Sequence, residues 1–283
     1  MKRPVGRLLF VMALALTLML STVSSAGAVT DGTLDGNGHP HVMMLLMEVD
    51  GQPAFRCSGT LIAPTFFLTA GHCAGAPGEF SGMRVFTESD VQAGIGTTNN
   101  YPFGGGASVE ALNWAAHPEY PNAPFFVHDV GMVELAEPIY LDTYGALPGV
   151  DAFDAWATRR GQNNVWFTSV GYGLQKSFPT AAAWKTQGSR TRYVANPKLI
   201  QVNVPGFTGD FSLLLSNNAN TGGTCFGDSG GPNFVRDTNV VAGVTSFGLN
   251  STCGGTGGVF RMDRQNVQDF INDFMANPYT PQP

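Results

Sequence analysis

The chain has 283 residues, enough for one large domain or two small ones with a substantial core. Only 13% of its residues are charged and 36 are glycine, which favours a β-rich, turn-rich globule over a helical bundle or a disordered chain. The formal net charge of −6, with no basic run beyond the N-terminus, argues against general nucleic-acid binding.

The N-terminus has the order of residues found in a secretory signal peptide. Three basic residues precede an apolar run over residues 8–20, and small residues follow it. The run is shorter than the roughly 20 residues that a membrane anchor needs. We therefore expect a signal peptide over 1–28, cleaved after Ala28 or Ala26. The mature protein, 29–283, is expected to be secreted, extracellular and free of the membrane.

Short segments rich in Val, Ile, Phe and Thr follow, separated by Gly, Pro and Asn. Such segments are typical of β-strands, and we expect strands over residues 42–49, 59–62, 66–69, 130–135, 165–171, 240–245 and 258–260. Residues 142–154 show no clear pattern and are expected to join two halves. Residues 94–106 and 174–193 are expected to form long surface loops.

Helical periodicity appears only near the end of the chain. Four apolar residues fall at helical spacing after Asp263, which is the expected N-cap: Val267, Phe270, Ile271 and Phe274. Many short strands followed by one terminal helix favour a fold of closed antiparallel barrels.

The four cysteines are Cys57, Cys73, Cys225 and Cys253. An even number in a secreted chain predicts two disulfides, and three pairings are open. Pairing of sequence neighbours would place one disulfide beside each of the two motifs described next. No Cys-x-x-Cys pair is present, which disfavours a zinc site. We expect no metal and no cofactor.

Three polar residues stand where apolar or glycine-rich segments end. His72 follows an apolar strand, Asp129 opens another, and Ser229 lies in the turn Gly-Asp-Ser-Gly-Gly-Pro over 227–232. Singly, each has an ordinary structural explanation as a strand-end, capping or turn residue. Together they match a chemical need, because a serine hydroxyl requires a base and oxyanion donors to act as a nucleophile. A histidine held by an aspartate supplies that base.

The chain resembles the chymotrypsin/trypsin family of serine endopeptidases over roughly 33–274. The resemblance rests on six motifs in family order: Cys-Ser-Gly-Thr-Leu-Ile (57–62), Leu-Thr-Ala-Gly-His-Cys (68–73), His-Asp-Val-Gly (128–131), Gly-Tyr-Gly (171–173), Cys-Phe-Gly-Asp-Ser-Gly-Gly-Pro (225–232) and Val-Thr-Ser-Phe-Gly (244–248).

The resemblance implies an all-β fold of two six-stranded antiparallel β-barrels with the active site between them and a C-terminal helix. The first barrel would span about 29–145, the second about 155–262, and the helix about 263–276. The family's pairing implies two disulfides, Cys57–Cys73 and Cys225–Cys253. Its other disulfides are missing here, so the loops that they would hold are expected to differ in shape.

The same resemblance implies hydrolysis of peptide bonds through an acyl-enzyme. Ser229 would be the nucleophile, His72 the base and Asp129 the residue that orients the base. The backbone N–H groups of Gly227 and Ser229 would hold the oxyanion. Substrates would be proteins or peptides, protein inhibitors would be partners, and the protein would be a monomer.

The family's primary specificity pocket maps onto six residues, Gly223, Thr224, Ser246, Phe247, Gly248 and Gly258. Trypsin-like members place an aspartate where this chain has Gly223. No acidic residue occurs in 217–225 or 247–260, so a buried cationic side chain would lack a counter-charge, at a cost of several kcal/mol. Members that cleave after Glu have a histidine where this chain has Thr245. We therefore expect a preference for large apolar or aromatic residues before the cut.

The chain departs from the family at its N-terminus. Family zymogens are cut before Ile/Val-Val-Gly-Gly, and the new amino group pairs with the aspartate beside the catalytic serine, here Asp228. This chain lacks that sequence. Either an amino group exposed at Val29 by signal cleavage inserts beside Asp228, or a side chain or water satisfies the carboxylate.

Two other functions compete with the endopeptidase. A catalytically silent homologue acting as a binding module would normally lack a triad residue, but all three are present. An α/β-hydrolase esterase would order its triad Ser, Asp, His, which is opposite to the order here.

Overall fold

A computed structural model describes residues 29–124, 126–157, 164–175 and 188–278. The expected signal peptide and most of the expected loop over 174–193 lie outside these residues. None of the helices in the described ranges is long and apolar enough to cross a membrane.

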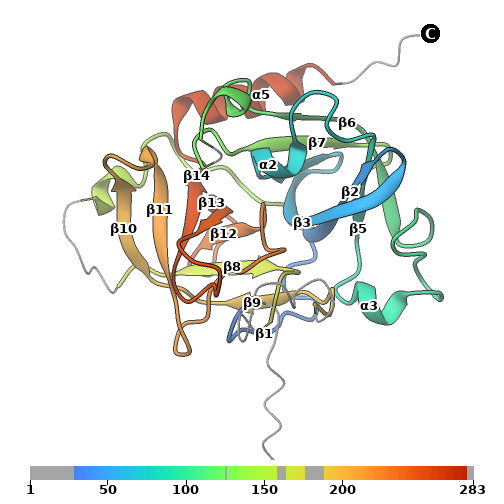
Figure 1. Cartoon of the computed structure of the whole chain (residues 1–283), viewed down its shortest axis with the longest axis horizontal. Helices are drawn as coiled ribbons and strands as arrows, with labels where there is room; N and C mark the ends of the chain where they lie inside the picture. Colours follow the sequence, from blue (N-terminus) through green and yellow to red (C-terminus); the bar gives the residue numbers. More distant parts are fainter. Residues whose placement is uncertain (1–28, 125, 158–163, 176–187, 279–283) are drawn as a thin grey trace, which may run out of the picture.

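The first half of the chain closes into a six-stranded antiparallel barrel (Figure 1). Asp50 and Gly51, both at positive φ, form the tight turn between its first two strands, as expected for an Asp-Gly hairpin. The barrel order is β2-β3-β4-β7-β6-β5, with β2 Val42–Val49, β3 Gln52–Ala63, β4 Phe66–Thr69, β5 Gly82–Phe86, β6 Ser108–Ala116 and β7 Gly131–Leu135.

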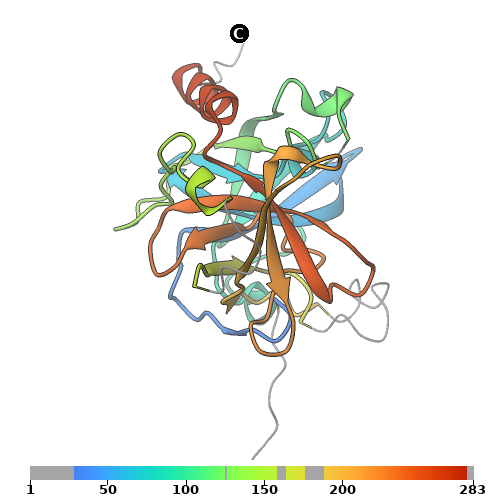
Figure 2. The ribbon, with the colours of Figure 1, turned by 90° about the vertical axis from the view of Figure 1, so that its left-hand side faces the viewer.

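The second half forms one curled sheet of eight strands (Figure 2). Its order is β1-β9-β8-β12-β13-β14-β11-β10, with β1 Thr33–Leu34, β8 Phe167–Gly171, β9 Tyr193–Ala195, β10 Leu199–Val204, β11 Gly209–Asn217, β12 Pro232–Val235, β13 Val241–Gly248 and β14 Gly255–Arg261. The predicted all-β fold, with one antiparallel unit in each half of the chain and a C-terminal helix, is confirmed. The strand number exceeds six partly because β1, from the segment expected in the first barrel, pairs with β9.

The strands predicted from the sequence agree with the observed strands to different degrees. The segments 42–49 and 66–69 coincide with β2 and β4, and the other five lie within or overlap β3, β7, β8, β13 and β14. Six strands between these were not predicted: β5, β6, β9, β10, β11 and β12. The short helices, also unpredicted, are α2 Gly71–Ala74, α3 Val91–Gly94, η1 Tyr120–Asn122 and η2 Asp154–Trp156.

The terminal helix α5, Gln265–Ala276, follows the second sheet but packs on the first barrel. Val267 and Ile271 are fully buried there, and the Phe274 ring meets Phe66 edge to face. Asp263 does not cap this helix, contrary to the sequence prediction. It is buried, and its carboxylate accepts hydrogen bonds from the Arg261 guanidinium at 2.7 and 2.8 Å.

The two halves share one apolar core. The cluster that fills the first barrel also contains residues of the second sheet, among them Val170, Phe234, Val244 and Phe260. Burying apolar side chains across this contact fixes the two halves relative to each other. Residues carried by either half can therefore form one site.

Candidate active site

His72 is presented by the short helix α2, immediately after the buried strand β4. The next residue, Cys73, forms a disulfide with Cys57 of β3, which ties this helix to the barrel wall. The His72 side chain remains 27% exposed, so a reactant can reach its ring.

Asp129 holds His72 from behind. Its carboxylate is fully buried just before β7 and accepts a hydrogen bond from the His72 backbone N–H at 2.8 Å. The same carboxylate lies 3.0 and 3.1 Å from His72 Nδ1. The Ser246 hydroxyl, from β13 of the second sheet, donates to it at 2.5 Å. Both halves of the molecule therefore fix this carboxylate.

The carboxylate also sets the charge preference of the imidazole. Burial opposes the protonated ring, but the charge of Asp129 and its hydrogen bond outweigh burial and raise the pKa of His72 above its ordinary value. In the neutral ring, the proton on Nδ1 faces Asp129, so Nε2 is left as the acceptor. This is the tautomer that a general base requires.

Ser229 lies in a turn in which the backbone N–H groups of Gly227 and Ser229 are available to donate hydrogen bonds. Its carbonyl accepts a hydrogen bond from the N–H of Ser58 in β3 at 2.8 Å, which anchors the turn to the first barrel. Within the described residues, the N–H groups of Gly227 and Ser229 have no acceptor, and the Ser229 hydroxyl has no hydrogen-bond partner. Gly227 has φ +95°, and a Cβ there would approach Gly173 Cα to 2.9 Å. This position therefore requires glycine.

Asp228 is satisfied by the protein's own backbone. Its two carboxylate oxygens accept hydrogen bonds from the N–H groups of Gly173, at 2.8 Å, and Cys225, at 2.9 Å. Burial raises the pKa of Asp228 to about 7, and these N–H groups and the charge of Arg56 partly oppose the rise. Val29 packs in a small buried cluster with Tyr193 and Ala195. Two N–H groups and the charge of Arg56 thus act where an inserted amino group usually does, and the backbone contribution was in neither sequence alternative.

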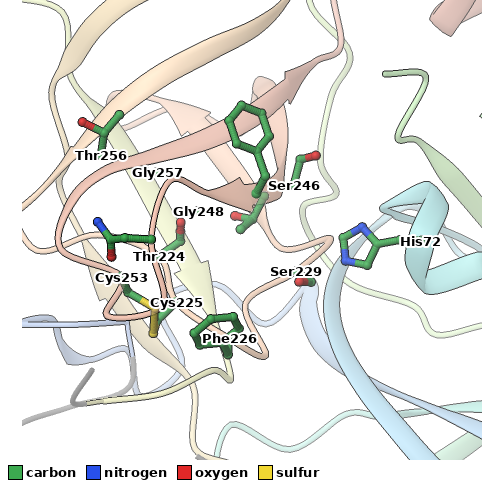
Figure 3. Close-up of a pocket in the computed structure, with 13 residues that line it drawn as sticks. His72, Thr224, Cys225, Phe226, Ser229, Ser246, Gly248, Cys253, Thr256 and Gly257 are labelled. Atoms are coloured by element: carbon green, nitrogen blue, oxygen red, sulfur yellow. A yellow bond between two sulfur atoms is a disulfide. The ribbon is translucent and has the colours of Figure 1, made fainter. Parts of the chain in front are cut away.

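A cavity of about 310 Å³ opens beside Ser229 and His72 (Figure 3). Of the residues assigned to the specificity pocket from sequence, Thr224, Ser246, Phe247 and Gly248 line it. Lining residues that sequence reasoning missed include Cys225, Phe226, Asn250, Cys253, Thr256 and Gly257. Apart from the His72 ring, no described lining residue is ionisable. A cationic side chain would therefore meet no counter-charge.

Two of the residues assigned to the pocket do not line this cavity. Gly223 pairs with Thr30 in a β-bridge, and a Cβ on it would approach Asn217 Cγ to 2.3 Å. Gly258 lies under the Phe247 ring, which a Cβ would meet at 2.2 Å. Gly258 therefore supports a wall of the cavity without lining it.

Aromatic rings continue the apolar surface beyond Phe247. This ring lies 5.7 Å from Phe126 and 5.6 Å from Phe207, and those two rings are 4.2 Å apart. Phe207 is 43% exposed, so part of this cluster faces solvent. The second disulfide, Cys225–Cys253, joins residues on either side of Ser229 in the sequence and contributes to the cavity lining.

Comparison with known proteins agrees with this fold. The trypsin family model matches residues 32–271. The chain is 26% identical over 255 residues to a collagenase of Hypoderma lineatum, covering 87% of this chain and 88% of the relative. It is 24% identical over 220 residues to brachyurin of Leptuca pugilator, covering 77% and 84%.

Among solved structures, HL collagenase superposes with a TM-score of 0.67 at 22% identity, covering 89% of this chain and all of that one. Human heparin binding protein superposes with a TM-score of 0.61 at 19% identity, covering 90% of this chain. At these identities the likeness shows the fold. Because the family model spans most of the chain, the protein belongs to the trypsin family of chymotrypsin-like serine proteases and is a serine-type endopeptidase.

Proposed function

We propose that the protein is a secreted endopeptidase that uses Ser229, His72 and Asp129 as its triad and cleaves after large apolar or aromatic residues. The observation that carries this proposal is the shared cavity. His72, held by Asp129 at 3.0 Å, lines the same cavity as Ser229, beside an apolar wall.

In the first half of the reaction, His72 Nε2 takes the proton of the Ser229 hydroxyl as Oγ attacks the scissile carbonyl. The buried charge of Asp129 stabilises the imidazolium that forms. The oxyanion accepts hydrogen bonds from the N–H groups of Gly227 and Ser229, which have no other acceptor among the described residues. Collapse of this intermediate requires the imidazolium to protonate the leaving amine, which leaves an acyl group on Ser229.

Water then completes the cycle. It attacks the acyl carbon while His72 again takes a proton, and the same N–H groups hold the second oxyanion. The carboxylic acid product leaves, and Ser229 regains its hydroxyl. No metal or cofactor is needed to balance either half.

Substrate choice follows from the cavity wall. A volume of about 310 Å³ between Thr224, Phe247 and Gly248 accommodates an aromatic or long aliphatic side chain. Burial of such a side chain is favourable by about 1.5–3 kcal/mol. Placing a lysine or arginine in this cavity, which has no acidic lining residue among those described, costs several kcal/mol instead.

Two measurements test the proposal. A fluorophosphonate probe should label the mature protein once, at Ser229, and the Ser229→Ala variant should not be labelled. A peptide panel should then be cleaved faster after Phe, Tyr or Leu than after Arg or Lys. Absence of labelling would reject the triad, whereas faster cleavage after Arg or Lys would reject only the preference.

Secretion and assembly complete the proposal. The basic and apolar order of residues 1–28 supports export, as do the disulfides Cys57–Cys73 and Cys225–Cys253, which persist in oxidising compartments. We expect a monomer that protein inhibitors block by occupying the cavity beside Ser229. N-terminal sequencing of protein from the culture medium and its sedimentation mass test these points.

A further inference from the structure

Two histidines and a glutamate converge where two strands of the first barrel meet. His117 follows β6, Glu119 lies in the turn after it, and His128 lies three residues before β7. One nitrogen of each ring and one oxygen of the carboxylate all lie within 4.8 Å of one another. Imidazole nitrogens and carboxylate oxygens are ligands that zinc takes in proteins. We call these three residues the His117 cluster.

Antiparallel pairing of β6 with β7 brings the two histidines together (Figure 1). Ala116 pairs with Gly131, and the His117 N–H donates to the Val130 carbonyl at 2.9 Å. The rings of His117 and His128 are stacked, with their centroids 4.9 Å apart and their planes inclined by 13°. The sequence did not indicate this cluster, because non-local strand pairing leaves little trace in a single sequence.

The separation of His128 and Glu119 suits an ion better than a direct hydrogen bond. His128 Nε2 lies 3.4 Å from Glu119 Oε2, whereas an N–H···O hydrogen bond is normally about 2.7–3.2 Å long. In a tetrahedral site with zinc–ligand bonds of about 2.0–2.1 Å, two ligand atoms lie about 3.4 Å apart. These two atoms therefore already have the spacing of zinc ligands. The His117 ligand atom needs to approach them by at most about 1.4 Å to complete the set.

Each ring has a nitrogen that is available to an ion. His117 Nδ1 accepts a hydrogen bond of 3.2 Å from the Glu119 backbone N–H, so the neutral ring carries its proton on Nε2. Its lone pair therefore faces the residue that bears the carboxylate. His128 Nδ1 is buried and has no hydrogen-bond partner among the described residues. This nitrogen therefore does not hold the His128 ring against the small rotation that ligation needs.

Aromatic rings enclose the His117 cluster on two sides. Phe270 of α5 meets the His117 ring edge to face at 5.4 Å, and Phe211 of β11 lies 5.0 Å from the His128 ring. His117 is buried, whereas the Glu119 side chain is 66% exposed, so an ion can enter from the side of the glutamate. The apolar walls exclude water, which strengthens the attraction between a bound cation and the carboxylate.

A second group of potential ligands lacks what an ion needs. Cys57, His72 and Cys73 also lie close together, but both sulfur atoms belong to one disulfide. A cysteine binds a metal ion as the thiolate, which a disulfide does not offer. Of these two groups in the described part of the chain, the His117 cluster alone retains three ligand atoms.

We propose that His117, Glu119 and His128 bind one Zn²⁺ ion, with water as the fourth ligand. This inference goes beyond the proposed function and does not rest on it. It departs from the sequence expectation of a protein without a metal. The ion links the end of β6 to the segment before Asp129, and it stabilises the folded protein because the unfolded chain does not bring the three ligands together.

Zinc titration of the mature Ser229→Ala protein tests the inference, because removal of the proposed nucleophile prevents self-digestion. Calorimetry at neutral pH should show one ion per chain. Zn²⁺ at about 100 times its Kd should raise the Tm by about 5 °C or more. Loss of an outer-shell partner alone weakens metal binding by about 10–100-fold. We therefore expect Glu119→Gln to weaken binding at least about tenfold and His128→Gln about 100-fold.

Two controls in the same background isolate the cluster. Glu137→Gln removes another exposed carboxylate, and His72→Ala removes an imidazole outside the cluster, so both should leave the affinity unchanged. Because Glu119 is exposed, Glu119→Gln tests the site even if His128→Gln does not fold. Absence of zinc binding, or binding that Glu119→Gln leaves intact, overturns the inference, as does binding that His72→Ala abolishes. Fluorophosphonate labelling of Ser229 in the wild type reports separately on the proposed function.

Discussion

The hydroxyl of Ser246 donates a hydrogen bond of 2.5 Å to the buried carboxylate of Asp129, and so joins β13 of the second sheet to the His72 pair of the first barrel. Asp129 thus accepts from three donors, of which two belong to His72. A buried carboxylate is stable only when such donors surround it. The orientation of the imidazole therefore depends on contact between the two halves.

Replacement of Ser246 by alanine should weaken this positioning without unfolding the protein. Loss of one of three donors to the Asp129 carboxylate costs about 1–3 kcal/mol, so we expect kcat/KM to fall about tenfold or more. Because the less solvated carboxylate attracts the imidazolium more strongly, the pKa of His72 should rise and the acidic limb of the pH profile should move to higher pH. Ser246→Thr, which keeps a hydroxyl, is the matched control. An unchanged profile in Ser246→Ala would contradict the positioning role.

Asp129→Asn tests the origin of the raised pKa of His72. The asparagine keeps the shape but removes the charge that favours the imidazolium, so the acidic limb of kcat/KM should move to lower pH. The rate at neutral pH should fall on the order of 10⁴-fold, since the amide can hold His72 in the wrong tautomer. Rates measured from pH 5 to 9 check both expectations. A limb that stays in place would show that Asp129 does not set the pKa.

The two strands whose bounds the sequence predicted in full are long or continuous apolar runs. β2 and β4 are largely buried, and their runs of apolar residues are visible in the sequence. By contrast, β6 (SVEALNWAA) has no fully buried position, and β10 (LIQVNV) mixes Gln and Asn with its apolar residues. Their pairing with β7 and β11 determines that they are strands, and such non-local pairing leaves little trace in a single sequence.

The candidate site shows the same division. The motifs indicated Ser229 and His72, because each of these residues lies in a short contiguous segment whose residue types and order can be seen in the sequence. Gly223 was assigned to the pocket by alignment with a family position, but Asn217 occupies the space where its side chain would lie. The hydrogen bond from the Gly173 N–H to Asp228 could not be predicted, since Gly173 lies 55 residues away in the sequence and only the fold brings it next to the carboxylate.

Because Asp228 is held by backbone N–H groups, activity should not depend on a free amino terminus. Acetylation of the mature N-terminus, or an added residue before Val29, should change kcat/KM by less than about twofold. In a protease that needs the inserted amino group, the same change would leave a buried carboxylate unpaired, which costs several kcal/mol. Comparison of acetylated and free protein on a Phe anilide provides the measurement. A loss of a hundredfold would restore the insertion hypothesis.

Thr224→Asp should introduce a counter-charge into the cavity beside Ser229. Thr224 lines this cavity, whereas Gly223 does not, so the carboxylate must be placed at 224 to meet a substrate cation. We expect the ratio of cleavage after Arg to cleavage after Phe to rise more than about tenfold. Thr224→Asn, of similar size but uncharged, should leave the ratio near that of the wild type. An equal shift in both variants would mean that shape, not charge, sets the preference.

Two buried groups should give opposite dependences of stability on pH. His41 is 4% exposed, and neither ring nitrogen has a hydrogen-bond partner among the described residues. Burial lowers the pKa of His41 to about 4, so its unfolded form binds a proton between pH 6.5 and 4 that the folded form does not. This effect destabilises the protein as the pH falls. Asp228, with a folded pKa of about 7, binds its proton more tightly when folded and so destabilises the protein as the pH rises from about 4 to 7.

Single substitutions should separate these opposing effects. When the pH is lowered from 7 to 4.5, the wild type should lose about 2 kcal/mol in the free energy of unfolding that His41→Leu does not lose. The variant lacks the buried imidazole that resists protonation in the folded state. Asp228→Asn should show the opposite trend, improving relative to the wild type as the pH rises over the same range. Urea unfolding at several pH values measures both differences. Asp35 and Asp154, whose pKa values are lowered, titrate below this window. A stability difference for His41→Leu that does not vary with pH would show that His41 has the same pKa in the folded and unfolded protein.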